Sequence, residues 1–310
     1  MFVGMTAGIR DSRLGIAAAI ALLAVAAILI AQAGGGDSAG AATAVAAKKK
    51  GGTGLRVSSK TFRLDQADNA VRYESICPRG KFPYGGGIFS SPDPADGEGV
   101  YPNSYERLGV QHGYHINGTL VKVGGGNPAG RNVTVQTICG SKPGSITPPH
   151  QTTFVDPGQT KTLTIGCGKR KLMGGGYQRT TGRSADGDVV TESHAEGNAW
   201  EVTAHGQGKF GGELTGIAYC LKGTGGNLIK DVSASVPIPP LSTATATTPG
   251  CPRGRRIAFG GFEAPSDGSV MWFGGYVTSA GTWAATAYNS SRTATATLTA
   301  HGYCLRPFNK

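Results

Sequence analysis

Three hydrophobic patterns follow one another along the chain. The first is a run of 18 uncharged apolar residues, Leu14–Ala31, which has no polar face at any helical period. The second, residues 34–58, is small, polar and aperiodic, as flexible linkers are. The remainder alternates apolar and polar residues in short runs bounded by turn residues, which predicts β-strands. No helical periodicity follows residue 50, so we expect an all-β fold after an N-terminal hydrophobic helix.

The apolar run predicts export. Eighteen helical residues rise about 27 Å, close to the thickness of a hydrocarbon core. Arg10 and Arg13 precede the run, and Ala31-Gln32-Ala33 ends it with the A-x-A pattern that signal peptidase reads. Residues 1–33 are therefore either a single-pass transmembrane anchor with its N-terminus inside, which the length favours, or a signal peptide cleaved near Ala33. Both interpretations place the rest of the chain outside the cytoplasm.

One motif occurs three times in this β-rich part. It reads "CPRGKFPYGGGIF" from residue 77, "CGKRKLMGGGYQ" from 167 and "CPRGRRIAFGGFE" from 251. Each copy closes with an alternating strand that ends in cysteine: "NVTVQTIC", "LTGIAYC" and "ATLTAHGYC". A further strand precedes the closing one, with Trp200 and Trp283 in matching places and Thr119 and Leu120 there in the first copy. We expect three similar antiparallel β units of five or six strands, at residues 59–140, 150–222 and 234–306.

The glycine clusters predict close approach. Consecutive glycines leave part of a strand without side chains, so another backbone or an aromatic ring can pack directly against it. The aromatic residues that follow, Phe89, Tyr177 and Phe262, are candidates to cover this bare surface. A phosphate-binding loop is the functional alternative, but it needs a following helix and usually a Lys-Ser/Thr pair, and neither is present.

The six cysteines predict disulfides. An even number in an exported chain is typical of a disulfide framework, and six cysteines allow 15 connectivities. The repeat selects one of them: Cys77–Cys139, Cys167–Cys220 and Cys251–Cys304. A zinc site is the alternative, but no CxxC or CxxH spacing occurs.

These motifs resemble a repeat of exported actinobacterial proteins, C-P-x-G-(K/R)-x-x-x-G-G-G-(aromatic) followed by a strand ending in cysteine. More distantly, three β units that each open with C-P-x-G are similar to the vitelline membrane outer layer protein. The resemblance covers residues 59–306 and implies a β-prism with a pseudo-threefold axis, while tandem independent units remain the alternative. The chain departs from the pattern at Gly168, where Pro is expected, at the shortened Gly260-Gly261 pair, and in the first copy, which lacks the tryptophan.

The chain is basic, with a formal net charge of +11, and a basic surface favours polyanions. Because the basic residues are scattered, a soluble surface with a mild positive bias is favoured over a dedicated binding surface. Basic residues nevertheless follow all three opening cysteines, so anionic cell-wall polymer or polysaccharide is the candidate partner, and nucleic acid is not expected. The candidate anion-binding residues are Arg79, Lys81, Lys169, Arg170, Lys171, Arg253, Arg255 and Arg256.

No catalytic pattern stands out. His112 and His115 form the tightest histidine pair, with Glu106 as the only local carboxylate; a solvated loop between strands is favoured over a metal site. We also expect His205 and His301 to face solvent. No pair of carboxylates among Glu192, Glu201, Glu213 and Glu263 recurs between the units, and no nucleophile or metalloprotease motif occurs.

These observations predict a non-catalytic structural or binding module outside the cytoplasm, without a cofactor or metal. Trp272 lies outside the repeating register, so it is the candidate for stacking on sugar rings, whereas Trp200 and Trp283 are expected in the core. A hydrolase acting on wall polysaccharide is the alternative, and it would need two carboxyl groups about 5–10 Å apart in a cleft.

Overall fold

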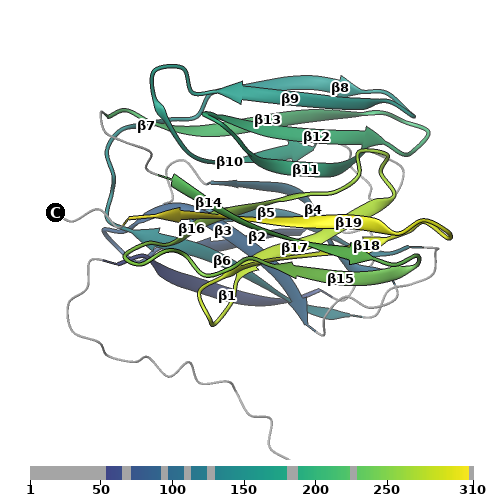
Figure 1. Ribbon diagram of the computed structural model, residues 1–310, viewed down its shortest axis with the longest axis horizontal. Helices are drawn as coiled ribbons and strands as arrows, with labels where there is room; N and C mark the ends of the chain where they lie inside the picture. The colour runs from purple at the N-terminus through teal and green to yellow at the C-terminus, as the bar shows by residue number, and fades with distance from the viewer. Residues whose placement is uncertain are drawn as a thin grey trace, which may run out of the picture. The chain divides into compact units, whose positions relative to one another are not determined.

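The computed structural model describes residues 54–64, 71–91, 97–107, 113–123, 130–179, 188–223 and 229–306. All of its regular structure is β, which confirms the predicted fold class (Figure 1). Within these ranges there is no helix with the length and apolar character that spanning a bilayer requires. The expected N-terminal helix, and the expected linker up to residue 53, lie outside the described residues. The predicted end of the linker at residue 58 is wrong, because β1 already begins at Arg56.

The nineteen strands fall into three successive groups, one for each expected repeat. The first group is β1 (Arg56–Leu64), β2 (Val71–Ile76), β3 (Phe82–Ser91), β4 (Glu98–Arg107), β5 (Gly113–Lys122) and β6 (Arg131–Gly140). The second is β7 (Ile146–Thr147), β8 (His150–Val155), β9 (Thr160–Gly166), β10 (Lys171–Arg179), β11 (Asp188–Glu196), β12 (Ala199–Gly206) and β13 (Gly212–Leu221). The third is β14 (Ile229–Ile238), β15 (Ser242–Thr247), β16 (Arg256–Glu263), β17 (Val270–Val277), β18 (Trp283–Asn289) and β19 (Ala296–Leu305).

The repeats interlock by sharing sheets. Sheet A runs β1-β6-β3-β17-β18-β15, sheet B runs β2-β5-β4-β10-β13 with β7 and β8 at its edge, and sheet C runs β14-β19-β16-β11-β12-β9. We number the strands of the second repeat from β8 and count β7 as an additional short strand. Each sheet then joins the first, sixth and third strands of one repeat to the fourth, fifth and second strands of another (Figure 1). The three repeats form a closed cycle of sheets with pseudo-threefold connectivity, so the alternative of tandem independent units is wrong.

The seams between repeats lie where the third strand of one repeat meets the fourth strand of another. Only a few residues pair there: Tyr177 with Tyr105, Phe262 with Ser193, and Ile88 with Gly275. These pairs occupy equivalent positions in the three repeats, which is the strongest sign of the internal symmetry.

The last glycine of each cluster makes its seam possible. A Cβ on Gly87, Gly176 or Gly261 would lie only 2.6, 2.0 or 2.3 Å from a backbone carbonyl oxygen of the crossing strand. Real Cβ atoms do not approach a carbonyl so closely, so only glycine lets the two backbones pair here.

The middle glycine of each cluster lies under an aromatic ring. A Cβ on Gly175 or Gly260 would come within 2.1 Å of the indole of Trp200 or Trp283, and both indoles are fully buried. In the first repeat Tyr114, at the start of β5, covers Gly86 in the same way, at 2.4 Å. The predicted close packing is confirmed, and the phosphate-loop alternative is wrong because the clusters lie inside strands.

Two details of that prediction are wrong. Tyr114, and not Thr119 or Leu120, takes the place of the missing tryptophan, because the ring must come from the start of the fifth strand to reach the glycine. The rings over the middle glycines also come from that strand, and not from Phe89, Tyr177 or Phe262, which follow the clusters in sequence.

The first cluster position explains why the third copy has one glycine fewer. Gly85, Gly174 and Phe259 hold this position in the three repeats. A Cβ on Gly85 would lie 2.5 Å from the side chain of Phe259, and one on Gly174 would lie 3.2 Å from its ring. The two glycines thus leave room for the side chain of Phe259. Because the third repeat has phenylalanine where the other two have glycine, the threefold symmetry is broken where the repeats meet.

The three predicted disulfides are confirmed: Cys77–Cys139, Cys167–Cys220 and Cys251–Cys304, with sequence separations of 62, 53 and 53 residues. In each pair one cysteine follows the second strand of its repeat and the other lies in the sixth strand, which belongs to a different sheet. Every disulfide therefore links two sheets. Closing loops of this length stabilises the fold by about 4 kcal/mol per bridge on chain-entropy grounds.

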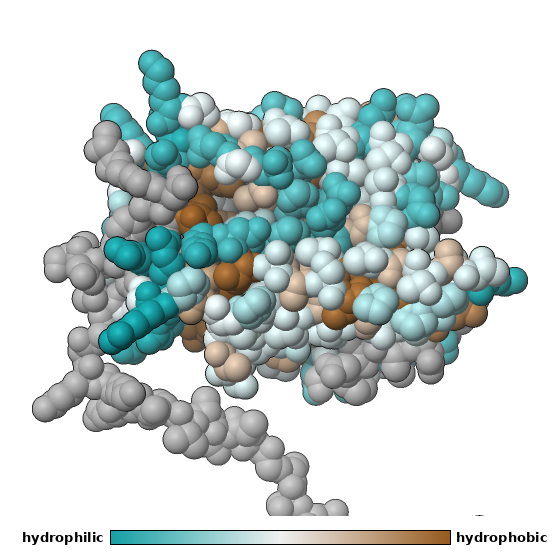
Figure 2. Space-filling model, viewed as in Figure 1, coloured by the Kyte–Doolittle hydropathy of each residue, from teal (hydrophilic) through white to brown (hydrophobic). Residues whose placement is uncertain are grey.

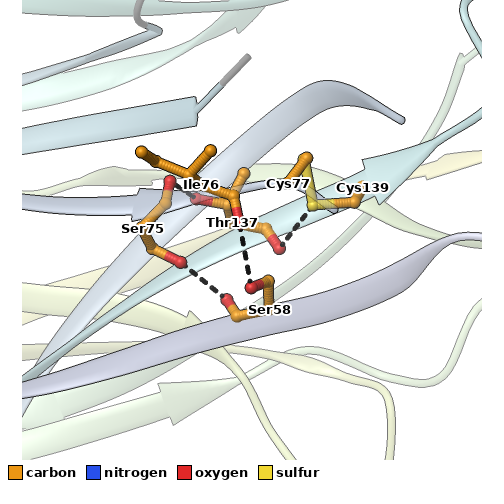
Figure 3. The surroundings of a disulfide bond; sticks show 6 residues. All are labelled: Ser58, Ser75, Ile76, Cys77, Thr137 and Cys139. Atoms are coloured by element: carbon orange, nitrogen blue, oxygen red, sulfur yellow. Dashed lines mark hydrogen bonds between the residues drawn. A yellow bond between two sulfur atoms is a disulfide. The ribbon is translucent and has the colours of Figure 1, made fainter. Parts of the chain in front are cut away.

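Hydrogen bonds reinforce the link around Cys77–Cys139 (Figure 3). The hydroxyl of Ser58 donates to the carbonyl of Ile76 at 3.1 Å, and the hydroxyl of Ser75 donates to the carbonyl of Ser58 at the same distance. Thr137 adds a buried bond of 2.6 Å to the carbonyl of Ser75. Since Ser58 and Thr137 belong to sheet A and Ser75 to sheet B, all three bonds cross between sheets.

Replacing Gly175 with alanine is expected to destabilise the fold, because the new methyl group would overlap the buried indole of Trp200. We expect the free energy of unfolding, measured by urea denaturation, to fall by about 3 kcal/mol. Gly166→Ala is the matched control, because nothing lies within 4 Å of a Cβ there; it should change stability by less than about 0.5 kcal/mol. Equal effects of the two substitutions would contradict this account of the glycine clusters.

Candidate functional site

The opening cysteine of each repeat is followed by a tight turn that displays basic side chains. The amide of Lys81 donates to the carbonyl of Pro78 at 2.9 Å, and that of Arg255 donates to Pro252 at 3.0 Å. Gly80 and Gly254 hold positive φ values of 77° and 79° inside these turns, which explains the C-P-x-G pattern.

The second repeat makes a turn of the same length that starts one residue earlier, at the cysteine itself. The amide of Arg170 donates to the carbonyl of Cys167 at 3.1 Å, and Gly168 supplies the positive φ, 57°. The glycine stands where the other two copies have proline, so the departure from the motif preserves the turn.

Contacts between repeats bring the three turns to the same end of the strands. The guanidinium of Arg107, at the end of β4, lies 4.8 Å over the ring of Phe82, at the start of β3, and 5.0 Å over the ring of Tyr219. Tyr219 belongs to the part of β13 that pairs with the start of β10. The guanidinium of Arg256, at the start of β16, lies 3.7 Å from the point that a Cβ on Gly54 would occupy. Gly54 precedes the start of β1. The same end of β6 pairs with the start of β1 and with the start of β3. We call this the basic end.

The basic side chains there are available to a partner. Arg79, Lys81, Lys169, Arg253 and Arg256 are exposed, and Arg170, Lys171 and Arg255 are half-buried. Apart from Arg255, which donates to the carbonyl of Cys304, none of these side chains has an ion pair or hydrogen bond with the residues that the structure describes. Figure 2 shows strongly hydrophilic side chains projecting at the left-hand side of the view. The structure therefore gathers the sequence-predicted anion-binding residues at one end.

A polar cavity of about 530 Å³ opens at the same end, between the second and third repeats. Its side chains include one cation, two carboxylates and one amide. Its lining is Lys171, Leu172, Ala195, Glu196, Gly197, Asn198, Ile229, Asp231 and Tyr303. Asn198 is fixed there, because its side-chain oxygen accepts from the amide of Leu172 and its nitrogen donates to the carbonyls of Gly168 and Arg170.

The prediction that Trp272 stacks on sugar rings is wrong. Its side chain is only 3% exposed. Its indole stacks on the ring of Phe262, with centroids 4.3 Å apart and planes 9° from parallel, and its edge meets Tyr105 and Tyr177. Trp272 thus fills the core between repeats, outside the tryptophan register because it belongs to the fourth strand and not the fifth.

The predicted histidine pair does not form a described metal site. His115 lies in β5 and its Nε2 is 2.9 Å from Oε1 of Glu106, to which Gln178 also donates. Both His115 and Glu106 are buried, so the expectation of a solvated loop is wrong for His115. His112 lies outside the described residues.

Sequence reasoning missed a group of titratable side chains on the outer face of sheet C. Donor atoms of Glu192, His194 and Glu201 all lie within 4.8 Å of one another. His194 is 8% exposed, and its ring stacks on that of His301 at 5.1 Å. The signal was present in the sequence, because Glu192 and His194 are two residues apart on one strand and so share a face. Their partner on the neighbouring strand could be recognised only once the register was known.

His301 couples this group to the third repeat. Its Nδ1 lies 3.4 Å from Asp231 and its Nε2 lies 3.5 Å from Glu263. Burial alone would lower the pKa of His301, but the hydrogen bonds and negative charges of Asp231 and Glu263 outweigh it and raise the pKa. The expectation that His301 faces solvent is wrong, because its side chain is only 12% exposed.

The raised pKa of His301 predicts a pH-dependent contribution to stability. The folded state binds the proton more tightly than the unfolded state, so the contribution is complete below the unfolded pKa and is lost as pH rises through the folded pKa. We expect the stability lost in His301→Gln to be larger at about pH 5 than at about pH 8, by less than about 1 kcal/mol because both partners are half-exposed. Urea denaturation with a chelator present measures this; a loss that grows with pH would contradict the assignment.

Comparison of the chain with protein-family models and with curated proteins gives no match. The basic end, the neighbouring cavity and the titratable group on sheet C are thus the features from which a function can be argued.

Proposed function

We propose that the protein is a non-catalytic binding module outside the cytoplasm, and that its basic end binds an anionic polysaccharide such as a cell-wall polymer. The observation that carries the proposal is the convergence of three basic turns, one from each repeat, at one end of the strands. A polyanion presents charges at regular intervals, so a surface that displays cations from three directions can engage several of them at once.

The scaffold supports this proposal. Each turn is tied to two sheets by the disulfide that begins it, so the basic side chains project from a fixed frame and little ordering is needed on binding. The disulfides are themselves consistent with an extracytoplasmic location, where an oxidising environment preserves them.

The N-terminal sequence supplies the rest of the proposal. Leu14–Ala31 would either hold the protein in the membrane or be removed with a signal peptide after export. In both cases the basic end would meet polymers of the cell surface.

Hydrolysis of wall polysaccharide is a second candidate, favoured by one observation. Glu196 and Asp231 both line the cavity at the basic end, and glycoside hydrolysis uses a pair of carboxyl groups. Release of reducing ends from wall polysaccharide, abolished in Glu196→Gln and Asp231→Asn, would favour this candidate over a purely binding role.

Binding to dextran sulfate, with uncharged dextran as the matched ligand, tests the proposal. We expect the full-length chain, purified in a mild non-ionic detergent, to bind dextran sulfate alone and to lose affinity as salt rises, because salt screens exposed charges. The triple variant Arg79→Gln, Lys169→Gln, Arg253→Gln should bind at least about tenfold more weakly, a loss of about 1.4 kcal/mol spread over three cation contacts.

The control is Lys122→Gln, Lys209→Gln, Arg292→Gln, which removes the same charge, one residue per repeat, at the opposite ends of the strands: Lys122 is the last residue of β5, and the other two lie in the loops after β12 and β18. Equal weakening by the two triple variants would show that net charge alone drives binding. That result, or the absence of binding to dextran sulfate, would overturn the proposal.

A further inference from the structure

The outer face of sheet C carries a set of donor atoms arranged like those of a metal site. We propose that Glu192, His194 and Glu201 bind a divalent transition-metal ion of the zinc class. This site is separate from the basic end and does not depend on the function proposed for it.

Strand geometry explains how three ligands meet. Glu192 and His194 lie two residues apart on β11, so both project from the same face. Glu201 on β12 is the direct cross-strand partner of His194. Donor atoms bound to one zinc ion lie about 3.3 Å apart, as tetrahedral geometry with bonds of about 2.0 Å requires. The donor atoms of the three residues now lie within 4.8 Å of one another. Small rotations of the two glutamate side chains would therefore bring them to bonding distance of one ion.

Each ligand is already held by a second residue, as in established metal sites. Thr203 donates to Oε2 of Glu192 at 2.8 Å, and Thr164 donates to Oε2 of Glu201 at 3.1 Å. Nδ1 of His194 lies 3.3 Å from the carbonyl oxygen of Ala195, and donation to that carbonyl would leave the lone pair of Nε2 for a metal.

His194 keeps one ring nitrogen free for an ion. It is more than nine-tenths buried, and its second ring nitrogen has no hydrogen-bond partner among the residues that the structure describes. It makes no ion pair with Glu201, although the two residues face each other directly. On sheet B the corresponding facing pair, Glu106 and His115, is in direct contact at 2.9 Å. The carboxylate and the imidazole are thus in direct contact on sheet B and are separated on sheet C.

The negative charges at the seam between β11 and β16 would also be stabilised by a cation. Glu192 lies directly opposite Glu263 across β11 and β16, and like charges in this position are destabilising. The corresponding pair on sheet B is Ser104 with Gln178, which carries no charge. Glu263 contacts His301, but among the described residues Glu192 is bonded only by the hydroxyl of Thr203. A divalent ion between Glu192, His194 and Glu201 would neutralise this concentration of charge.

The donor set favours one class of ion. Imidazole suits zinc and its first-row neighbours, whereas calcium and magnesium prefer oxygen ligands alone. Three protein ligands leave a fourth coordination position, which is typical of zinc sites that also bind water or an external ligand. Glu192 and Glu201 are half-buried, so that position is open to solvent.

Isothermal titration of the full-length, metal-free chain with zinc chloride tests the site, using protein without a polyhistidine tag. We expect one equivalent to bind, thermal unfolding to shift upward on addition of zinc, and magnesium or calcium chloride at the same concentration to have no comparable effect. His194→Asn and, separately, Glu201→Gln should each weaken zinc binding at least tenfold. Both variants must keep the unfolding temperature of the metal-free wild type, which separates lost binding from lost folding.

His150→Asn is the matched control, an exposed histidine on sheet B, and it should bind zinc as the wild type does. Absence of zinc binding would overturn the proposal. So would binding that survives both His194→Asn and Glu201→Gln, or binding in which calcium competes equally with zinc, because an acidic surface patch alone would give that result.

Discussion

The structure depends on the close approach of backbones where one repeat crosses another. At each seam the third strand of one repeat pairs with the fourth strand of the preceding repeat in the cycle over only a few residues, and a glycine lies against the crossing carbonyl. A side chain at that position would hold the strands apart and open the sheet. Because every sheet is built from two repeats, opening one seam would expose the core of both. The glycine clusters therefore allow three similar segments to pair with one another and form one fold.

Side chains from the sixth strands complete the same seams. The hydroxyls of Tyr219 and Tyr303 accept from the amides of Arg107 and Ala195, at 2.7 and 2.6 Å. The first repeat has no tyrosine there, and Gln136 bonds both the amide and the carbonyl of Val277 instead. Each seam thus satisfies a backbone group that the short ladder leaves unpaired. This frame fixes the starts of β3, β10 and β16, and so the basic turns that precede them, while it leaves the outer sheet faces free to diverge between repeats.

Much of this architecture could be predicted from the sequence, and the remaining features could not, for identifiable physical reasons. The all-β class, the disulfide pairing and the need for close packing at the glycines follow from local patterns. The exchange of strands between sheets depends on pairing far apart in sequence, which no local pattern encodes. Trp272 was misassigned because its burial arises at a seam between repeats. The cluster of Glu192, His194 and Glu201 is a product of strand register, and the buried ion pair of Arg179 with Asp188 arises between two sheets.

Calorimetry tests the central claim, that the three repeats fold as one unit through shared sheets. With disulfides intact, we predict a single thermal transition whose van't Hoff enthalpy matches the calorimetric enthalpy, about 170 kcal/mol for some 250 residues. Three independent units would instead give a van't Hoff enthalpy of about one third of that value, near 60 kcal/mol. That ratio, or three resolved transitions, would contradict the account.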